Sequence, residues 1–226
     1  WLVGKRRGVD RGVEPHNVPF VILGASILWF GWFGFNAGSG LAADGLAISA
    51  FLVTNTAAAM ALVVWVILGH IHTGKMSAVG AATGAVAGLV AITPASGFVG
   101  PMGAIAIGLG AGVLTFYAVR IRHKFGFDDA LEVMAVHGIG GIWGALATGI
   151  FAVGGIGLID GDAKVLGYNA VAVLSTIAYS FVVTFVILKI LDVIPGLGLR
   201  ADDAAEDAGL DVSLHGERAY VGDGAD

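Results

Sequence analysis

The sequence predicts an all-α protein, a polytopic membrane helix bundle, from its composition and from the placement of its charges. Apolar residues make up 57% of the 226 positions and charged residues 13%, about half the roughly 25% of an ordinary soluble domain. Glycine occupies 37 positions, more than twice the usual ~7%. No charged residue occurs from Gly45 to Gly74 or from Met76 to Val119. A soluble helix cannot lack charge over such lengths unless it is buried on every side.

Six apolar runs have the length of about 20 residues that spans the hydrocarbon core of a bilayer, and each is predicted to be a transmembrane helix. In order they are Pro19–Gly38, Gly45–Gly69, Met76–Pro94, Pro101–Arg122, Asp129–Val153 and Tyr168–Val193. The breaks between them carry turn residues: Gly38-Ser39-Gly40, His72-Thr73-Gly74, Pro94 to Gly100, Gly154-Gly155 and Pro195-Gly196. Barrel strands are disfavoured because they would alternate apolar and polar residues. The first run follows a basic stretch but leads into another apolar run, so a cleaved signal sequence is not expected.

The lysines and arginines predict how the chain crosses the membrane, because these residues favour cytoplasmic loops. In the six-helix arrangement, eleven of the twelve fall on one side, and Lys164 alone falls on the other. The eleven are Lys5, Arg6, Arg7, Arg11, Lys75, Arg120, Arg122, Lys124, Lys189, Arg200 and Arg218. We therefore expect a multi-pass cell-membrane protein with both chain ends in the cytoplasm.

Three regions follow from this arrangement. Residues 1–18 are predicted to be a cytoplasmic loop, residues 19–195 the six-helix transmembrane region, and residues 196–226 a cytoplasmic tail. The tail is acidic and is either a solvated, mobile end or a docking and regulatory segment. The net charge of −5 lies mainly there and gives no indication of nucleic-acid binding. Residue 1 is Trp rather than Met, so we expect the sequence to begin inside a longer protein.

The absence of cysteine excludes disulfides and thiolate metal sites, and no motif indicates a metal or a cofactor. His70 and His72 alone are a weak metal signal, and a solvated loop is the favoured interpretation. The glycines recur at four-residue spacing, which brings them to one helix face and allows close helix packing in lipid. Such pairs and runs are Gly34/Gly38, Gly80/Gly84/Gly88, Gly108/Gly112 and Gly140/Gly144. Packing alone explains any single glycine, while together they are also compatible with a narrow pathway.

His137 is the only ionisable residue predicted to lie deep in a span, about two turns after Asp129. An ionisable group at that depth is a functional candidate because it is costly to place there. One interpretation is a core histidine bonded to a neighbouring helix. The other is a proton-handling or hydrogen-bonding group that lines a path, since a neutral imidazole donates from one nitrogen and accepts at the other.

The end of the first span combines aromatic rings with a hydroxyl. Phe35 and Ser39 share a helix face at i, i+4 spacing, and Thr93 ends the third span on the same outer side. Such a group can attract a small cation through cation–π contact and hydrogen bonding. The alternative for Trp29 and Trp32 is an aromatic belt that anchors the helix at the interface.

Four motifs resemble the ammonium transporters of the Amt/Mep/Rh class, and the resemblance extends over essentially the whole chain. The motifs are GWFGFNAGS (Gly31–Ser39), TPASGFVG (Thr93–Gly100), DDALEVMAVHGIGGIWG (Asp128–Gly144) and GLDVSLHGERAY (Gly209–Tyr220). The family has eleven transmembrane helices in an inverted repeat and forms trimers with one pore per subunit. This chain resembles helices six to eleven and the cytoplasmic tail.

The resemblance implies a role for each matching residue. Phe35 resembles one of two stacked gate phenylalanines, Ser39 the hydroxyl of the outer ammonium-recruiting site, and His137 the second of two pore histidines. Thr93 is expected near the outer vestibule, and Trp32 and Trp143 around the pore. The first pore histidine, the other gate phenylalanine and the outer-site tryptophan belong to helices one to five in the family. The chain by itself is therefore not expected to form a complete pore.

The resemblance implies transport of ammonium or ammonia through a hydrophobic pore in a lipid bilayer, in a homotrimer and without a cofactor. Two other functions stay open. One is an ammonium sensor or regulatory protein that docks a PII-type signal protein; the other is a structural or non-conducting half-length fragment. A membrane-embedded enzyme is disfavoured, since several ionisable groups converging at membrane depth would be expected and only His137 is found.

Overall fold

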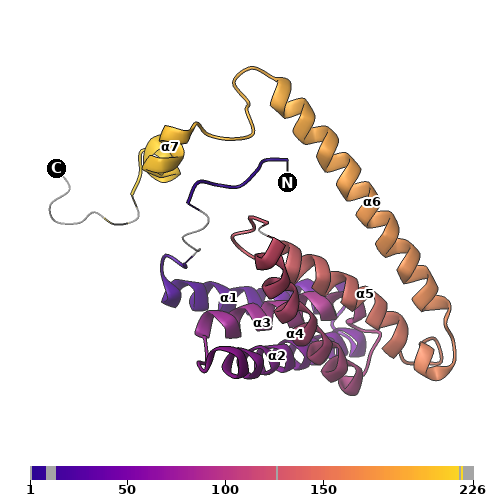
Figure 1. Cartoon of the computed structure of the whole chain (residues 1–226). Helices are drawn as coiled ribbons and strands as arrows, with labels where there is room; N and C mark the ends of the chain where they lie inside the picture. The colour runs from indigo at the N-terminus through magenta and orange to yellow at the C-terminus, as the bar shows by residue number, and fades with distance from the viewer. Residues whose placement is uncertain (1, 9–13, 126, 219, 221–226) are drawn as a thin grey trace. The chain divides into compact units, whose positions relative to one another are not determined.

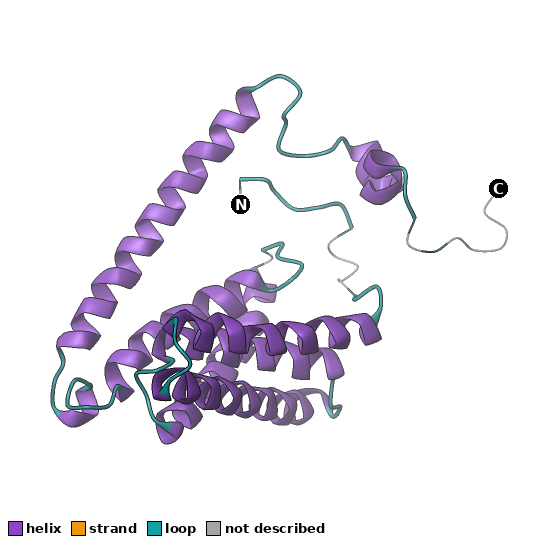
Figure 2. Cartoon of the chain, turned by 180° about the vertical axis from the view of Figure 1, so that it is seen from behind, coloured by secondary structure: helices purple, strands orange, loops and turns teal. Residues whose placement is uncertain are grey.

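The computed structural model describes residues 2–8, 14–125, 127–218 and 220, and within these residues it contains helices and no strands (Figures 1 and 2). Arg11, which contributed to the predicted orientation, lies outside the described residues, as do Trp1 and residues 221–226 of the predicted tail. Among the described residues, six helices are long and apolar enough to cross a membrane. The predicted all-α membrane bundle of six spans is therefore confirmed.

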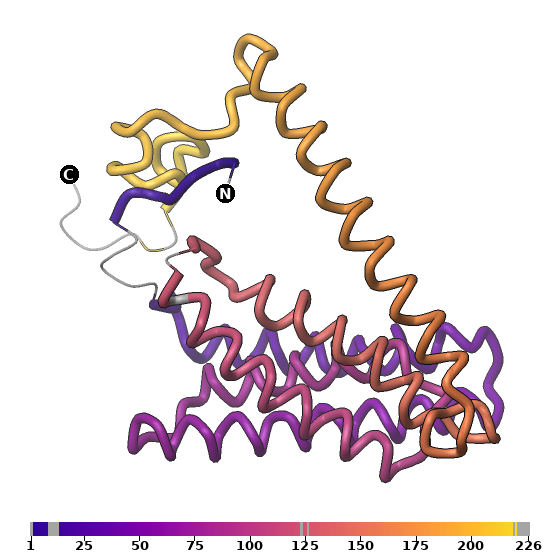
Figure 3. The backbone as a smooth tube through the Cα atoms, turned by 45° about the vertical axis from the view of Figure 1, so that its right-hand side comes forward, coloured from indigo at the N-terminus to yellow at the C-terminus, as the bar shows by residue number. Residues whose placement is uncertain are grey.

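The chain divides into two units, and the larger covers residues 14–176. It contains five main helices and the beginning of a sixth, which extends into the other unit. The main helices are α1 (Val18–Ala37), α2 (Gly45–Thr73), α3 (Ala78–Ile92), α4 (Pro101–Phe125), α5 (Gly140–Phe151) and α6 (Lys164–Val193). Short helical turns accompany them: η2 (Gly38–Gly40), η3 (Thr93–Ala95), η4 (Met134–Ile139) and η5 (Leu158–Asp160). Helices α1 to α5 run side by side along the bundle (Figure 3).

Two helix boundaries differ from the predicted ones in ways that matter for function. The fifth span begins at Met134 rather than Asp129, because the Asp129 carboxylate accepts a hydrogen bond from the Met134 amide at 2.8 Å. His137 therefore lies in the first turn of the span and not two turns inside it. Helix α2 continues to Thr73, so His70 and His72 lie in its last turn rather than in a loop. Histidines are favourable at a helix C-terminus, where the backbone carbonyls carry partial negative charge.

The core of the bundle is built largely from alanines, which lets the helix backbones approach one another. The buried cluster lies where α2, α3, α4 and α5 meet and contains Val53, Ala57, Ala61, Ala91, Ile92, Ala104, Ile107, Ala111 and Ala147. Glycines at this junction have no room for a side chain: a Cβ on Gly88 would lie 2.7 Å from Ala58 Cα. Gly34 and Gly38 differ, because nothing in the described chain lies within 4 Å of the Cβ they lack. The predicted close packing thus holds for Gly88 but not for this pair.

The smaller unit combines the first residues of the chain with residues 177–226. Its tail forms the short helix α7 (Asp203–Ala208) and the turn η6 (Asp211–His215). The Arg7 guanidinium pairs with Asp203 at 2.9 Å and with Asp207 at 2.8 Å. Arg200 pairs with Glu206 at 2.5 Å and donates to the Lys5 carbonyl at 2.7 Å. The described part of the tail is therefore folded against the segment that precedes α1, which disfavours the prediction of a mobile end.

Candidate functional site

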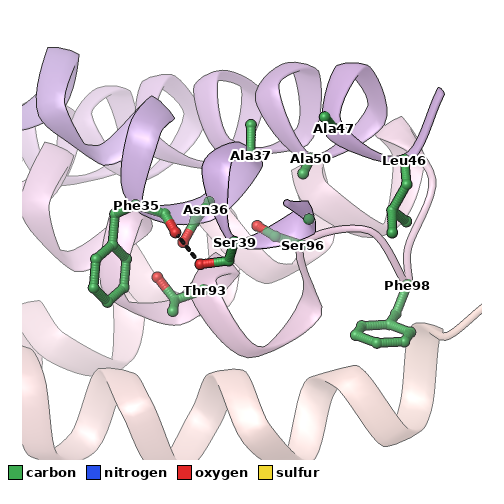
Figure 4. A pocket seen from close by; sticks show the side chains of 11 residues that line it. Phe35, Asn36, Ala37, Ser39, Leu46, Ala47, Ala50, Thr93, Ser96 and Phe98 are labelled. Atoms are coloured by element: carbon green, nitrogen blue, oxygen red, sulfur yellow. Dashed lines mark hydrogen bonds between the residues drawn. The ribbon is translucent and has the colours of Figure 1, made fainter. Parts of the chain in front are cut away.

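A cavity of about 280 Å³ lies where the C-terminal ends of α1 and α3 meet the beginning of α2 (Figure 4). Three of the predicted site residues line it together: Phe35, Ser39 and Thr93. The other lining residues are Asn36, Ala37, Gly40, Leu46, Ala47, Ala50, Ser96 and Phe98. The wall is thus mainly apolar, with hydroxyls and one amide placed in it, which is the usual make-up of a site for a small molecule.

Ser39 follows the last turn of α1, and its hydroxyl is already oriented. Its Oγ donates to the Phe35 carbonyl at 2.5 Å, one helical turn back. A hydroxyl has one hydrogen to donate and two lone pairs to accept with. Because the hydrogen is used within the chain, the exposed Ser39 oxygen offers only acceptor capacity to a ligand. That polarity suits a ligand that carries N–H or O–H donors.

The Trp32 side chain connects α1 to η3 next to the cavity. Its Nε1 donates to Thr93 Oγ1 at 2.8 Å, and its ring meets the Phe35 ring edge-on, with 5.5 Å between centroids. Thr93 in turn donates to the Leu89 carbonyl at 2.8 Å. The Trp32 N–H is therefore bound inside the bundle, which argues against an interfacial belt role for this residue.

A polar network beneath the cavity was missed by the sequence analysis. The Asn36 amide is only 7% exposed, and its Nδ2 donates to Thr54 Oγ1 at 2.9 Å. Thr54 is fully buried, and its Oγ1 lies 3.3 Å from Ser96 Oγ. The network ties α1, α2 and the turn after α3 together at the cavity floor. The signal in the sequence is a set of uncharged polar residues in or beside the apolar runs, of which only the hydroxyls of Ser39 and Thr93, at the ends of spans, are predicted site residues.

His137 and Trp143 do not line this cavity. His137 lies in η4, a π-helical turn that opens the fifth span, and its side chain is exposed. Trp143 is partly buried on α5 and donates from Nε1 to the Ile107 carbonyl of α4 at 2.9 Å. Its ring occupies the space that a side chain at Gly110 would need. The predicted site residues thus fall into an outer group around the cavity and two separate positions on the fifth span.

Comparisons with known proteins agree over nearly the whole chain. Residues 1–220 match the Ammonium Transporter Family. The chain is 46% identical to the ammonium transporter of Bacillus subtilis over 97% of its own length and 55% of that protein. It is 48% identical to the ammonium transporter Amt1 of Archaeoglobus fulgidus over 97% of its own length and 56% of that protein. The chain therefore spans about half the length of the curated relatives it matches.

Solved structures show the same fold. The crystal structure of Mep2 from Saccharomyces cerevisiae is similar with a TM-score of 0.79 and 36% identity, over 83% of this chain and 47% of that one. A structure described as a sensor Amt protein is similar with a TM-score of 0.83 and 34% identity, over 94% of this chain and 55% of that one. The six apolar helices, the matched residues and these relatives together show that the chain belongs to the ammonium transporter family.

Proposed function

We propose that the protein containing this chain transports ammonium or ammonia across the cell membrane, and that the cavity at the end of α1 is the outer recruiting site. The carrying observation is that Thr93, more than fifty residues away in sequence, lines one cavity together with Phe35 and Ser39. Ammonium carries only N–H donors, and the Ser39 oxygen is an acceptor. The Phe35 ring adds a face that attracts cations. The relatives are named transporters, and we assign no catalytic reaction.

Beyond the recruiting site, the proposed path is apolar and passes His137. A bare cation in such surroundings is strongly disfavoured, so the proton separates from the nitrogen and ammonia moves as a neutral molecule. A neutral imidazole can donate to or accept from ammonia and can relay the proton separately. The side chains of Phe35 and His137 are both exposed in the chain. This exposure leaves both side chains free to face residues from another part of the protein. In the family, helices one to five supply such residues.

Uptake of methylammonium by cells without their own ammonium transporters tests this proposal. The variants are made in the full coding sequence that contains this chain. Ser39→Ala is expected to raise KM, because it removes the acceptor, and His137→Ala to abolish selective uptake or alter the ammonium/potassium selectivity. Ser26→Ala is the matched control, since its exposed hydroxyl on the same helix also bonds the carbonyl four residues earlier, at 2.8 Å. Unchanged flux and selectivity in His137→Ala would exclude the proposed role of His137.

The orientation and assembly are also proposals. Both chain ends are placed in the cytoplasm, as residues 1–18 and 196–226, with a homotrimer in the membrane. The contacts of Arg7 with Asp203 and Asp207 support one part of this proposal, that the two segments lie on the same side of the membrane. The choice of the cytoplasmic side rests on the distribution of lysines and arginines, and the homotrimer rests on the family resemblance.

A sensor is the second candidate, favoured by the similarity to a structure described as a sensor Amt protein. In this alternative the tail and the cytoplasmic loops dock a PII-type signal protein. Transport and sensing are separated by the same uptake assay, because a protein that only senses would give no uptake in the unmodified form.

A further inference from the structure

The loop between α4 and the π-helical turn η4 is held by a bidentate ion pair. Arg122, at the end of α4, is 9% exposed, and the Glu132 side chain is 20% exposed. Arg122 donates from Nε to Glu132 Oε2 at 2.6 Å and from Nη2 to Oε1 at 2.5 Å, and it also donates to the Phe127 carbonyl. Paired guanidinium–carboxylate bonds of this kind fix direction as well as distance.

The backbone of Glu132 is held in a conformation that a residue with a side chain rarely adopts. Its φ is +56°, in the left-handed region. Such a conformation persists only where the surroundings impose it, and it recurs at functional sites. The next turn starts directly from it, because the Val136 amide donates to the Glu132 carbonyl at 2.8 Å. The start of the fifth span is therefore anchored to α4 through both the side chain and the backbone of Glu132.

A second anchor holds the other end of this segment. Gly144 on α5 lies so close to α3 that a Cβ on it would be 2.8 Å from Ala91 Cα. Gly140, one turn earlier, is also buried. Because Gly144 leaves no room for a side chain at this contact, α5 cannot rotate against α3 without placing a larger residue against the Ala91 backbone.

Between the two anchors the chain holds more residues than an α-helical turn accommodates. Met134–Ile139 is π-helical, so each bond spans one residue more than in an α-helix. Relaxation of this turn to an α-helix would rotate the residues before it by about 100° relative to α5, the angle of one helical residue. Ala135 and Val136 are buried, whereas His137 is exposed. The direction in which His137 points thus depends on the π-helical turn.

We propose that Arg122 and Glu132 are positioning residues that maintain the π-helical turn and thereby aim His137 along the transport path. The inference rests on the proposed function, because it assigns its effect to His137. Neither side chain needs to meet the transported molecule. Their loss is expected to slow transport and to leave recruitment at the cavity of Phe35 and Ser39 unaffected. That cavity is lined by residues of α1, η2, α2, η3 and the segment after η3, and by none of η4.

The test uses Glu132→Gly in the full coding sequence that contains this chain. Glycine accepts a positive φ without strain, so this variant removes the carboxylate and keeps the backbone conformation accessible. Vmax for methylammonium uptake is expected to fall roughly ten-fold or more, since a displacement of about 1 Å in a reacting group can cost on the order of 100-fold in rate. KM is expected to stay unchanged. Lys124→Ala is the control, because this basic residue at the same helix end is exposed.

A structure of Glu132→Gly gives a readout that does not depend on uptake. Residues 134–139 are expected to form an α-helical turn with His137 on a different face. The double variant Arg122→Leu with Glu132→Gly removes both charges of the ion pair, so that no charge of this pair is left buried without its partner. The double variant is expected to show the same fall in Vmax and the same α-helical turn. It replaces Glu132→Gly in the test if the Glu132→Gly protein does not reach the membrane.

The outcomes separate this proposal from the proposed function. If His137→Ala leaves uptake and selectivity unchanged, the role of His137 fails, and the positioning role fails with it. If His137→Ala abolishes uptake while the Glu132 variants keep the original Vmax and the π-helical turn, only the positioning role is overturned. A rise in KM at constant Vmax in the Glu132 variants would also overturn it, because such a change would indicate an effect on binding at the outer cavity and not on His137.

Discussion

Asn36 is the side chain that most directly fixes the geometry of the outer cavity. It follows Phe35 in sequence, is 7% exposed and bonds Thr54 on the neighbouring helix at 2.9 Å. In the membrane, water cannot replace a lost hydrogen bond, so a buried polar group without its partner is costly. The amide therefore couples the position of α1 to that of α2 at the level where Phe35 meets the cavity.

Replacing Asn36 with Ala is expected to lower the stability of the bundle by about 0.5–1.5 kcal/mol, the net contribution of one hydrogen bond, because Thr54 keeps its bond to the Ala50 carbonyl and its contact with Ser96. Thermal unfolding of the purified protein in detergent measures the change. Asn55→Ala is the matched control, because Asn55 is exposed on α2 and such substitutions usually change stability by less than about 0.5 kcal/mol. Equal shifts in the two variants would contradict a structural role of the network.

The residues of the outer cavity were only partly predictable. Phe35, Ser39 and Thr93 stand out as aromatic and hydroxyl groups at the ends of apolar runs. The Thr54 hydroxyl does not, because a threonine inside a membrane helix commonly bonds the carbonyl of the preceding turn. Thr54 and Thr56 both form that bond, at 2.6 Å and 2.9 Å. Only Thr54 also meets a side chain from another helix, and this depends on packing rather than on local sequence.

At the level of the element, α5 shows how glycine spacing defines a helix face. Gly140 and Gly144 are buried, with Gly144 against the Ala91 backbone of α3. Nothing in the described chain lies within 4 Å of the position that a Cβ on Gly141 would take. Gly141, which has open space beside it, and Gly144, which is in close contact, are only three residues apart on the same helix. A comparison of the two positions therefore isolates the effect of the close helix contact.

Gly144→Ala is expected to destabilise the bundle by about 1–3 kcal/mol, the usual cost of overpacking a close contact. The added methyl group would displace α5 from α3. Gly141→Ala on the same helix is expected to be neutral or slightly stabilising in the chain, because alanine is the better helix former. Thermal unfolding of both purified variants in one detergent checks the difference, and a Gly144→Ala protein as stable as the parent would show that the contact can relax.

The start of the fifth span depends on contacts with other helices, so the positions of the charges do not predict it. The predicted start at Asp129 followed from the position of the charges, whereas the helix begins at Met134 with a π-helical turn. In our proposal the π-helical turn is maintained by anchors at its two ends. It depends on the Arg122–Glu132 pair and on the Gly144 contact, which involve α4 and α3.

At the scale of the whole molecule, the sensor alternative assigns the docking of a signal protein to the tail. Helix α7 is held to the first residues of the chain by Arg7 and Arg200. Single exposed ion pairs contribute only about 0–1 kcal/mol and weaken with salt. The two pairs of Arg7, whose side chains are largely exposed, can therefore be released by a partner that competes for Asp203 and Asp207.

Under the sensor alternative, deletion of residues 196–226 from the full coding sequence is expected to abolish retention of a PII-type signal protein, because the proposed docking segment is removed. A pull-down from solubilised membranes measures retention, with the uncut protein as the positive control. The single variant Arg7→Ala is expected to retain the partner, since it leaves the tail itself intact. Retention that survives the deletion would place the docking surface in the cytoplasmic loops instead.

The sequence by itself determined the all-helical membrane fold, the six spans and the family, because long uncharged runs admit few structures in lipid and the family motifs are continuous in sequence. The tertiary structure decided which polar residues meet. The Asn36–Thr54–Ser96 network, the shared cavity of Phe35, Ser39 and Thr93, and the direction of His137 all depend on contacts between helices that are distant in sequence. In lipid these contacts are set by close packing, and so by the fit of whole helix faces rather than by the pattern along any one of them.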